Sequence, residues 1–191
     1  MILNLMTSAT IKTQLGIAAI DTTYDAAITA MIPIVSNDIR RILNCNYDNY
    51  VYATLTNGSD EMVLNTGYYS VIDIPQEVYN MGQVVYSPAL PADTYIESFD
   101  PISLVYTLSA DATAAGTYIY PTLGIGQWPA VAKMIFYKIG KQTTSAATAT
   151  TYKSVKYGNV SKTFSDSEIN KKHDYPQVFL NELGAPYAKV G

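Results

Sequence analysis

The hydrophobic pattern of the chain changes its period twice, and this restricts the folds that are open to it. Between Ile28 and Leu43 apolar residues recur at gaps of three and four, which places them on one face of a helix. From Tyr47 to about Gly126 the pattern changes to short alternating runs and turn residues, which are typical of β-strands. Helical spacing returns at Trp128. The sequence therefore predicts helices on both sides of a β-rich stretch.

Start and stop signals predict four helices in all. A short helix over residues 7–15 precedes the long amphipathic one, which ends at Asn44, a residue type that tolerates the left-handed conformation. A third helix is expected over residues 128–141. Pro176 suits the opening of a fourth helix, and Gly184 ends it.

The middle of the chain predicts a small antiparallel β subdomain. Residues 50–56 alternate and are followed by Asn57-Gly58, a pair that favours a tight turn. Residues 61–74, with a break near Gly67, and residues 102–108 and 117–120 also have the composition of strands. In the stretch before residue 102, the three prolines Pro88, Pro91 and Pro101 favour loops or edge positions.

A second hairpin is predicted near the C-terminal end. Residues 152–157 and 160–165 flank Gly158-Asn159, which suits a two-residue connection. Two strands alone are marginally stable, so this hairpin must dock on helices or pair with another chain. The residues expected at an inter-subunit hairpin contact are Tyr152, Val155, Tyr157, Val160 and Phe164.

Charge is distributed unevenly, although the net charge is only -4. Residues 42–132 contain nine carboxylates and no lysine or arginine, whereas residues 133–191 carry nine lysines against four carboxylates. The two halves either face different partners or are solvated surfaces with no partner. A nucleic-acid-binding face would combine basic residues with stacking aromatics. Most of the tyrosines lie where lysine is absent, so specific nucleic-acid binding is not expected.

Composition excludes several classes of protein. Only 15% of the residues are charged, against about 25% in an average domain, which disfavours a coiled coil or a highly charged disordered chain. No apolar run approaches the roughly 20 residues of a membrane span, and the first residues lack the pattern of a signal peptide. A single cysteine excludes a disulfide framework and a cysteine-built metal site.

Candidate catalytic chemistry is sparse. His173 beside Asp174 has the pairing of an oriented base, but an exposed loop histidine explains the pair as well. Cys45 is a nucleophile only if the fold brings that histidine to it. We therefore expect no catalytic, cofactor-binding or metal-binding residues, and no enzyme activity.

Tyrosine is abundant, and eleven of the 17 tyrosines lie between Tyr47 and Tyr120. Tyrosine combines a large contact area with a polar tip, which suits protein interfaces. It also suits sugar stacking and ordinary sheet faces. Composition leaves these three uses open.

Two parts of the chain contain motifs that occur together in a known order. The first part runs from TIKTQLGI into DTTYDAAITAMIPIVSNDIRRILNCN, within residues 7–46. The second part, within residues 128–191, contains YKSVKYGNVSKTF and then YPQVFLNELGAPYAKVG. Together they resemble the head–tail connector (adaptor) proteins of tailed phages, which have a long helix with an Asn-rich exit, and later a Gly-centred hairpin, a short helix and a tail.

The resemblance implies an α+β fold. A small helical core of about four helices with a β-hairpin is expected from residues 1–46 and 128–191. Residues 47–127 depart from the compact family pattern and are expected to form an inserted, Tyr-rich, acidic β subdomain.

The function that the resemblance implies is that of a structural virion protein. Connectors of this family form a ring, expected here to be dodecameric, beneath the portal protein in the phage neck. The ring extends the channel through which DNA passes without specific binding, and it docks a stopper or another neck or tail protein. The protein would be made in the cytoplasm of the host bacterium, with no cofactor and no membrane partner.

The C-terminal segment is the expected docking site for the portal or another partner. Its predicted interface residues are Tyr175, Phe179, Leu180, Leu183, Tyr187, Lys171 and Lys172. Two other hypotheses stay open. The tyrosine-rich β part is a binding module for carbohydrate, such as a virion surface decoration, or the chain is an enzyme that uses His173.

Overall fold

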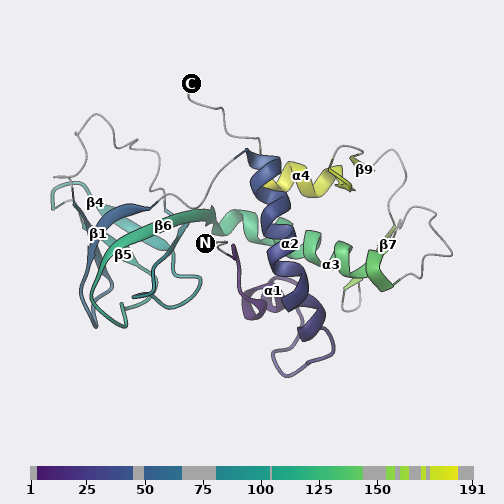
Figure 1. Cartoon of the computed structure of the whole chain (residues 1–191), viewed down its shortest axis with the longest axis horizontal. Helices are drawn as coiled ribbons and strands as arrows, with labels where there is room; N and C mark the ends of the chain where they lie inside the picture. The colour runs from purple at the N-terminus through teal and green to yellow at the C-terminus, as the bar shows by residue number, and fades with distance from the viewer. Residues whose placement is uncertain are drawn as a thin grey trace. The chain divides into compact units, whose positions relative to one another are not determined.

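The computed structural model describes residues 4–44, 50–65, 81–103, 105–143, 154–157, 160–163, 169–170 and 173–184, with backbone only for 141–143 and for the strands between 154 and 170. The chain divides into two compact units (Figure 1). Residues 46–126 form one, here named the β unit. Residues 2–45 and 127–191 together form the other, here named the helical unit.

The helical unit is organised around one central helix, which the other three contact (Figure 1). The central helix is α3 (Trp128–Thr143), and its neighbours are α1 (Ser8–Gln14), α2 (Asp25–Leu43) and α4 (Gln177–Leu183). A helix that is apolar on all sides needs partners on all sides. Seven of the ten residues between Ala130 and Ile139 fit this description, being apolar or aromatic and at most 3% exposed.

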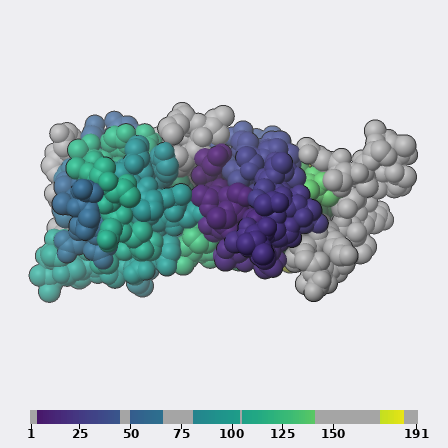
Figure 2. Space-filling model, turned by 90° about the horizontal axis from the view of Figure 1, so that it is seen from below, coloured from purple at the N-terminus to yellow at the C-terminus, as the bar shows by residue number. Residues whose placement is uncertain are grey.

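The junction between α1 and α2 is held by a buried lysine. The ammonium of Lys12 donates to the carbonyl oxygens of Ala19 and Asp21 at 2.9 and 2.6 Å, and to the carboxylate of Asp25 at 2.9 Å. Its three N–H groups therefore each have an acceptor. In Figure 2 the two helices, in purple and blue, lie side by side in the surface of this unit.

The β unit is a six-stranded antiparallel sheet with the strand order β3-β6-β1-β2-β5-β4. The two outermost strands of this order also approach each other, through a bridge between Val84 and Tyr95 and hydrogen bonds from Gly82 to Ile96 and from Val85 to Thr94. The sheet therefore curves until it nearly closes on itself. Its strands are β1 (Val51–Leu55), β2 (Glu61–Leu64), β3 (Gln83–Tyr86), β4 (Ile96–Asp100), β5 (Val105–Leu108) and β6 (Gly116–Gly124).

Inside this curved sheet lies a separate hydrophobic core. It contains Ala53, Leu55, Met62, Val85, Ile96, Leu108 and Ile119, each 2% exposed or less. Gly116 on β6 is part of the packing, because a Cβ there would lie 2.9 Å from the Cβ of Ala89. Each unit thus has its own core.

Four short strands follow α3. β7 (Ser154–Tyr157) pairs antiparallel with β8 (Val160–Thr163), and β9 (Ile169–Asn170) pairs with β10 (Tyr175–Pro176). The backbone of β7 lies against α3.

The predicted α+β class is confirmed, with four helices and one larger antiparallel sheet in the described residues. The turn at Asn57-Gly58 joins β1 to β2 as predicted, with Gly58 at a φ of 75°. Two strands were missed near the prolines that favoured loops: β3 ends two residues before Pro88, and β4 lies between Pro91 and Pro101. β5 is shorter than the predicted strand at 102–108, since residues 101–103 form a turn.

Candidate functional site

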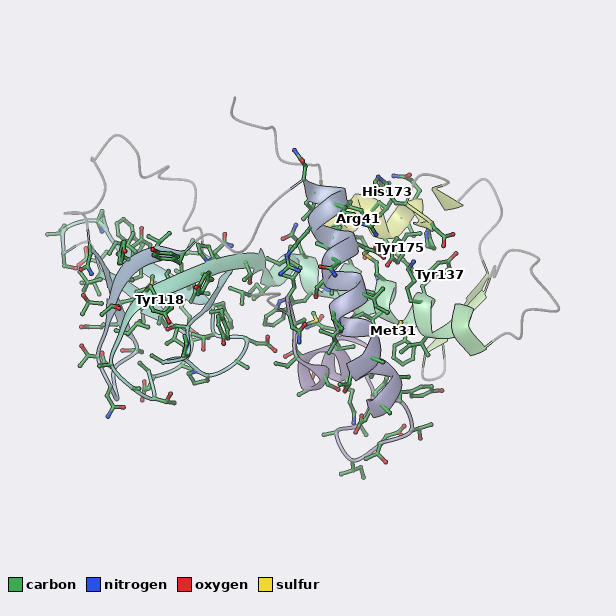
Figure 3. All side chains as sticks on the ribbon, in the orientation of Figure 1. Met31, Arg41, Tyr118, Tyr137, His173 and Tyr175 are labelled. Carbon is green, nitrogen blue, oxygen red and sulfur yellow. The ribbon has the colours of Figure 1, made fainter. Side chains whose placement is uncertain are left out.

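Five tyrosines form a continuous surface on the outside of the β unit. They lie before or on β1 (Tyr50, Tyr52), on β3 (Tyr86) and on β6 (Tyr118, Tyr120), three strands that are neighbours in the sheet. Tyr118 and Tyr120 flank the fully buried Ile119, so the alternation of the strand points both rings outward. We name these five residues the tyrosine surface, and Tyr118 marks its place in Figure 3.

The rings of the tyrosine surface contact one another edge to face. The ring centroid of Tyr50 is 5.3 Å from that of Tyr52, 5.9 Å from Tyr118 and 6.0 Å from Tyr120. Tyr86 extends the set in a different geometry, with its ring centroid 6.2 Å from that of Tyr120 and the two ring planes tilted by 44°. Tyr50 is 47% exposed and the other four are half-buried. Rings that hold one another in this way offer a preformed aromatic surface with hydroxyl groups at its rim.

The remaining strands of the β unit carry exposed carboxylates. Glu61 begins β2, and Glu97 and Asp100 lie on β4. The Ser103 hydroxyl and the Ile102 N–H hydrogen-bond to Asp100 and hold the pKa of that carboxyl below its usual value. Since residues 46–126 contain no Lys, Arg or His, none of these charges is neutralised inside the unit.

A second polar site lies inside the helical unit, around the buried Asp38 of α2. The Tyr175 hydroxyl donates to Asp38 Oδ2 at 2.7 Å, and the Arg41 guanidinium donates to Oδ1. Lys138 of α3 lies 3.5 Å from the same carboxylate, with its ammonium 4.7 Å from the centre of the Tyr175 ring. Figure 3 shows Arg41, Tyr175 and His173 close together at the C-terminal end of α2.

Burial controls the chemistry of the phenols near Asp38. Burial raises the pKa of Tyr175, and its hydrogen bond to Asp38 raises it further. Burial, with a smaller contribution from the Asp174 charge, raises the pKa of Tyr137 to about 12. Both phenols are therefore protonated at neutral pH, and Tyr175 acts as a hydrogen-bond donor that joins β10 to α2.

The predicted interface residues of the C-terminal segment lie mostly in the interior. Tyr175, Phe179, Leu180 and Leu183 are at most 7% exposed, because they pack α4 and β10 against the rest of the helical unit. They are therefore part of the core and not an exposed apolar anchor in this structure. Tyr187, Lys171 and Lys172 lie outside the described residues.

The predicted hairpin contact is described only in part. Val155 and Tyr157 lie on β7 and Val160 lies on β8, where the backbone alone is described. Tyr152 and Phe164 lie outside the described residues, as does Cys45. His173 lines a hollow of about 270 Å³ with Asp38, Arg41 and Ile42.

The sequence patterns did not indicate that Asp38, Lys138 and Lys12 join separate elements of the helical unit. The spacing of Asp38 and Arg41 on one helix face was the available signal. The contact between Asp38 and Tyr175 spans 137 positions, and no local pattern indicates it.

Comparison of the chain with protein-family models, curated proteins and solved structures finds no match. In the described part of the chain no group of three or more His, Cys, Asp or Glu residues is placed to hold a metal ion. None of the helices described is both long and apolar enough to cross a membrane.

Proposed function

We propose that the chain is a ring-forming subunit of a phage head–tail connector. The order of elements supports this proposal: a short helix, a long helix, an inserted β unit, a third helix, a paired-strand hairpin and a last short helix. This is the order that the resemblance in residues 7–46 and 128–191 leads one to expect.

The observation that carries the proposal is the isolated β7–β8 pair. Within the described residues these two strands form a sheet of their own, so each has an outer edge with N–H and C=O groups directed away from its partner. Open strand edges pair readily with another chain. A repeated edge contact between copies forms a ring when its rotation closes.

The test is the mass and shape of the assembled protein. Mass photometry and negative-stain class averages of the concentrated protein should show a closed ring of about a dozen copies. Tyr157 pairs with Val160 across a two-residue connection, so alternation directs the N–H of Lys156 away from β8. Replacing Lys156 by Pro removes this outer donor and should reduce the ring population. A variant with Pro in place of Ala92, an exposed loop residue of the β unit, serves as control. A protein that stays monomeric alone and with the portal protein of the same genome would contradict the proposal.

Portal docking needs a test that spares the core. Deleting residues 174–191 would remove at least five buried side chains and unfold the helical unit, so it cannot test docking. Reversing the charge of Lys171 and Lys172 together is the sharper change. We expect it to weaken portal binding at low salt while Trp128 fluorescence keeps its folded value. Unchanged portal affinity would remove these lysines from the interface.

The tyrosine surface favours a second candidate function, carbohydrate binding. Aromatic rings with hydroxyl rims suit sugar stacking, and the absence of cations in the unit favours a neutral glycan. The Tyr50→Ala and Tyr118→Ala variants should lose saturable binding on a glycan array, while Tyr24→Ala in the helical unit should keep it. If the unchanged protein binds no glycan, this candidate is rejected.

A further inference from the structure

The two units carry opposite charge. Residues 46–126 contain nine carboxylates and no basic residue, a net charge of -9. The helical unit carries twelve basic residues and seven carboxylates, a net charge of +5. A surface with charge of one sign attracts a complementary surface and repels others like itself. Every copy of the chain therefore carries both a charged surface and its complement.

The turn between β4 and β5 has the features of a docking element. Ile102 at its tip is 94% exposed, and Phe99 is 40% exposed, with its ring stacked on Tyr106 at a centroid distance of 4.4 Å. The Asp100 carboxylate accepts hydrogen bonds from the Ile102 N–H at 2.9 Å and from the Ser103 hydroxyl at 2.6 Å, which fixes the turn. With the exposed Glu97, the turn presents apolar side chains next to two carboxylates.

A surface with the complementary features lies on α2. A hollow of about 600 Å³ is lined by Ile34, Asn37, Asp38, Arg40 and Arg41. Ile34 is 43% exposed, and the Arg41 side chain is 77% exposed. The Asp38 carboxylate is bound by Arg41, Tyr175 and Lys138, and Arg40 donates to Asn37. With three cations against one carboxylate, this group of side chains carries a net positive charge. The hollow thus offers an apolar side chain next to two cations.

We propose that the β4–β5 turn of one copy docks in the α2 hollow of a second copy. Ile102 and Phe99 would pack on Ile34, while Glu97 and Asp100 would face Arg40 and Arg41. Each copy uses a different surface on each side, which is a heterologous contact, and such contacts build rings or open filaments. This inference adds a specific contact between copies to the proposed connector function. Only the closing of the ring rests on that function.

Two variants that change only exposed positions test the contact in the full chain. The turn variant combines Glu97→Lys with Ile102→Lys, and the hollow variant combines Ile34→Glu with Asn37→Glu. Each should self-associate at least about tenfold more weakly than the unchanged protein, by sedimentation at low salt. Mixed in equal amounts, they should associate again, because the lysine turn fits the glutamate hollow and the unchanged surfaces fit each other.

Control variants carry charge changes of the same sign elsewhere. Asp111→Lys on the β unit and Asn181→Glu on α4 should associate as the unchanged protein does. Circular dichroism checks that every variant is folded. Two loss-of-association variants that fail to restore assembly when mixed would overturn the inference, as would an unchanged protein that stays monomeric at low salt.

The outcomes separate this contact from the connector function. A closed ring that both variants still form overturns the docking of the turn but supports a connector. Open filaments or dimers restored by mixing support the docking and contradict the ring.

Discussion

At the scale of single residues, two buried polar side chains join segments that are far apart in the chain. Lys12 fixes the loop between α1 and α2 through three acceptors, and Tyr175 fixes the end of the chain to α2 through Asp38. A buried polar group stabilises a fold only while its partners are in place, since an unpaired one retains its full desolvation cost. Substitutions at these two sites should therefore have large effects.

Replacing Lys12 by Met tests the first of these sites. The change keeps the buried stem but leaves the Ala19 and Asp21 carbonyls without their donor. We expect a loss of about 2–4 kcal/mol in the free energy of unfolding, measured with urea by Trp128 fluorescence. Lys133→Met removes an ammonium from a more exposed ion pair with Glu182 and should cost less than about 1 kcal/mol. Equal losses would contradict the role given to Lys12.

Replacing Tyr175 by Phe tests the second site. The change removes the hydroxyl that donates to Asp38 and leaves the ring in place. A hydrogen bond to a charged group contributes about 1.5–3 kcal/mol, and we expect a loss of that size. Tyr24→Phe removes the same atom from a ring that is 36% exposed and should change stability by less than about 0.5 kcal/mol.

The buried phenols also predict sensitivity to alkali. The pKa of Tyr137 is raised from 10.0 to about 12 in the folded state. Above pH 10 the unfolded chain releases a proton that the folded chain keeps. The contribution of this group to the free energy of unfolding is therefore fully present below pH 10 and is lost as the pH rises towards 12. The slope should reach about 1.4 kcal/mol per pH unit for each such group. Urea titrations across this range should show a shallower decline for Tyr137→Phe.

Single residues also mark where prediction from sequence ends. Asn44 was expected to allow the left-handed exit of α2, and it has a φ of 54°. Lys12 belongs to a residue type that is almost never fully buried, and its acceptors are two backbone carbonyls and one carboxylate. No sequence pattern specifies which carbonyls a loop will present.

At the scale of elements, helices were easier to predict than strands. The apolar faces of α2 and α3 repeat over many residues, so their period is well defined. β3 lacks alternation because the consecutive Val84 and Val85 are both buried, at 4% and 1% exposure. That pattern arises because β3 contacts both β6 and β4 where the sheet nearly closes. The closing of the sheet depends on strands that are far apart in the chain, so no local sequence pattern indicates it.

The β1–β2 turn gives a prediction at this scale. Gly58 has a φ of 75°, where a side chain costs about 1–2 kcal/mol, so Gly58→Ala should destabilise the β unit by that amount. Gly126→Ala is a matched control, because a Cβ would meet no atom within 4 Å at either position. Thermal unfolding followed by tyrosine near-ultraviolet circular dichroism measures both. Equal melting temperatures for the two variants would contradict the turn argument.

At the scale of the whole molecule, the separation of charge sets the response to salt. The nine carboxylates of the β unit repel one another, and salt screens this repulsion. Raising sodium chloride should therefore raise the melting temperature of the β unit, by about 4–8 °C for each kcal/mol gained. Association between copies should weaken in the same titration. A β unit that melts at a lower temperature in salt would contradict the charge argument.

Two features of the sequence predicted the division of the chain, the change in hydrophobic period and the extent of the resemblance. Together they placed the boundaries at 46/47 and 127/128, and the contacts divide the chain at 45/46 and 126/127. The tyrosine surface was not predictable in the same way. Tyr50, Tyr86 and Tyr120 come together only because β3 and β1 both pair with β6.

The insertion also has a consequence for the order of events during synthesis. The apolar face of α2 finds its partner in α3, and the whole β unit is translated between them. At about 5–20 residues per second, translation takes on the order of 4–17 seconds to pass from the end of α2 to the start of α3. The β unit is complete earlier and can fold on the ribosome. During that interval the nascent chain exposes the side of α2 that carries Ile28, Val35 and Ile39, which is where we expect a chaperone to bind.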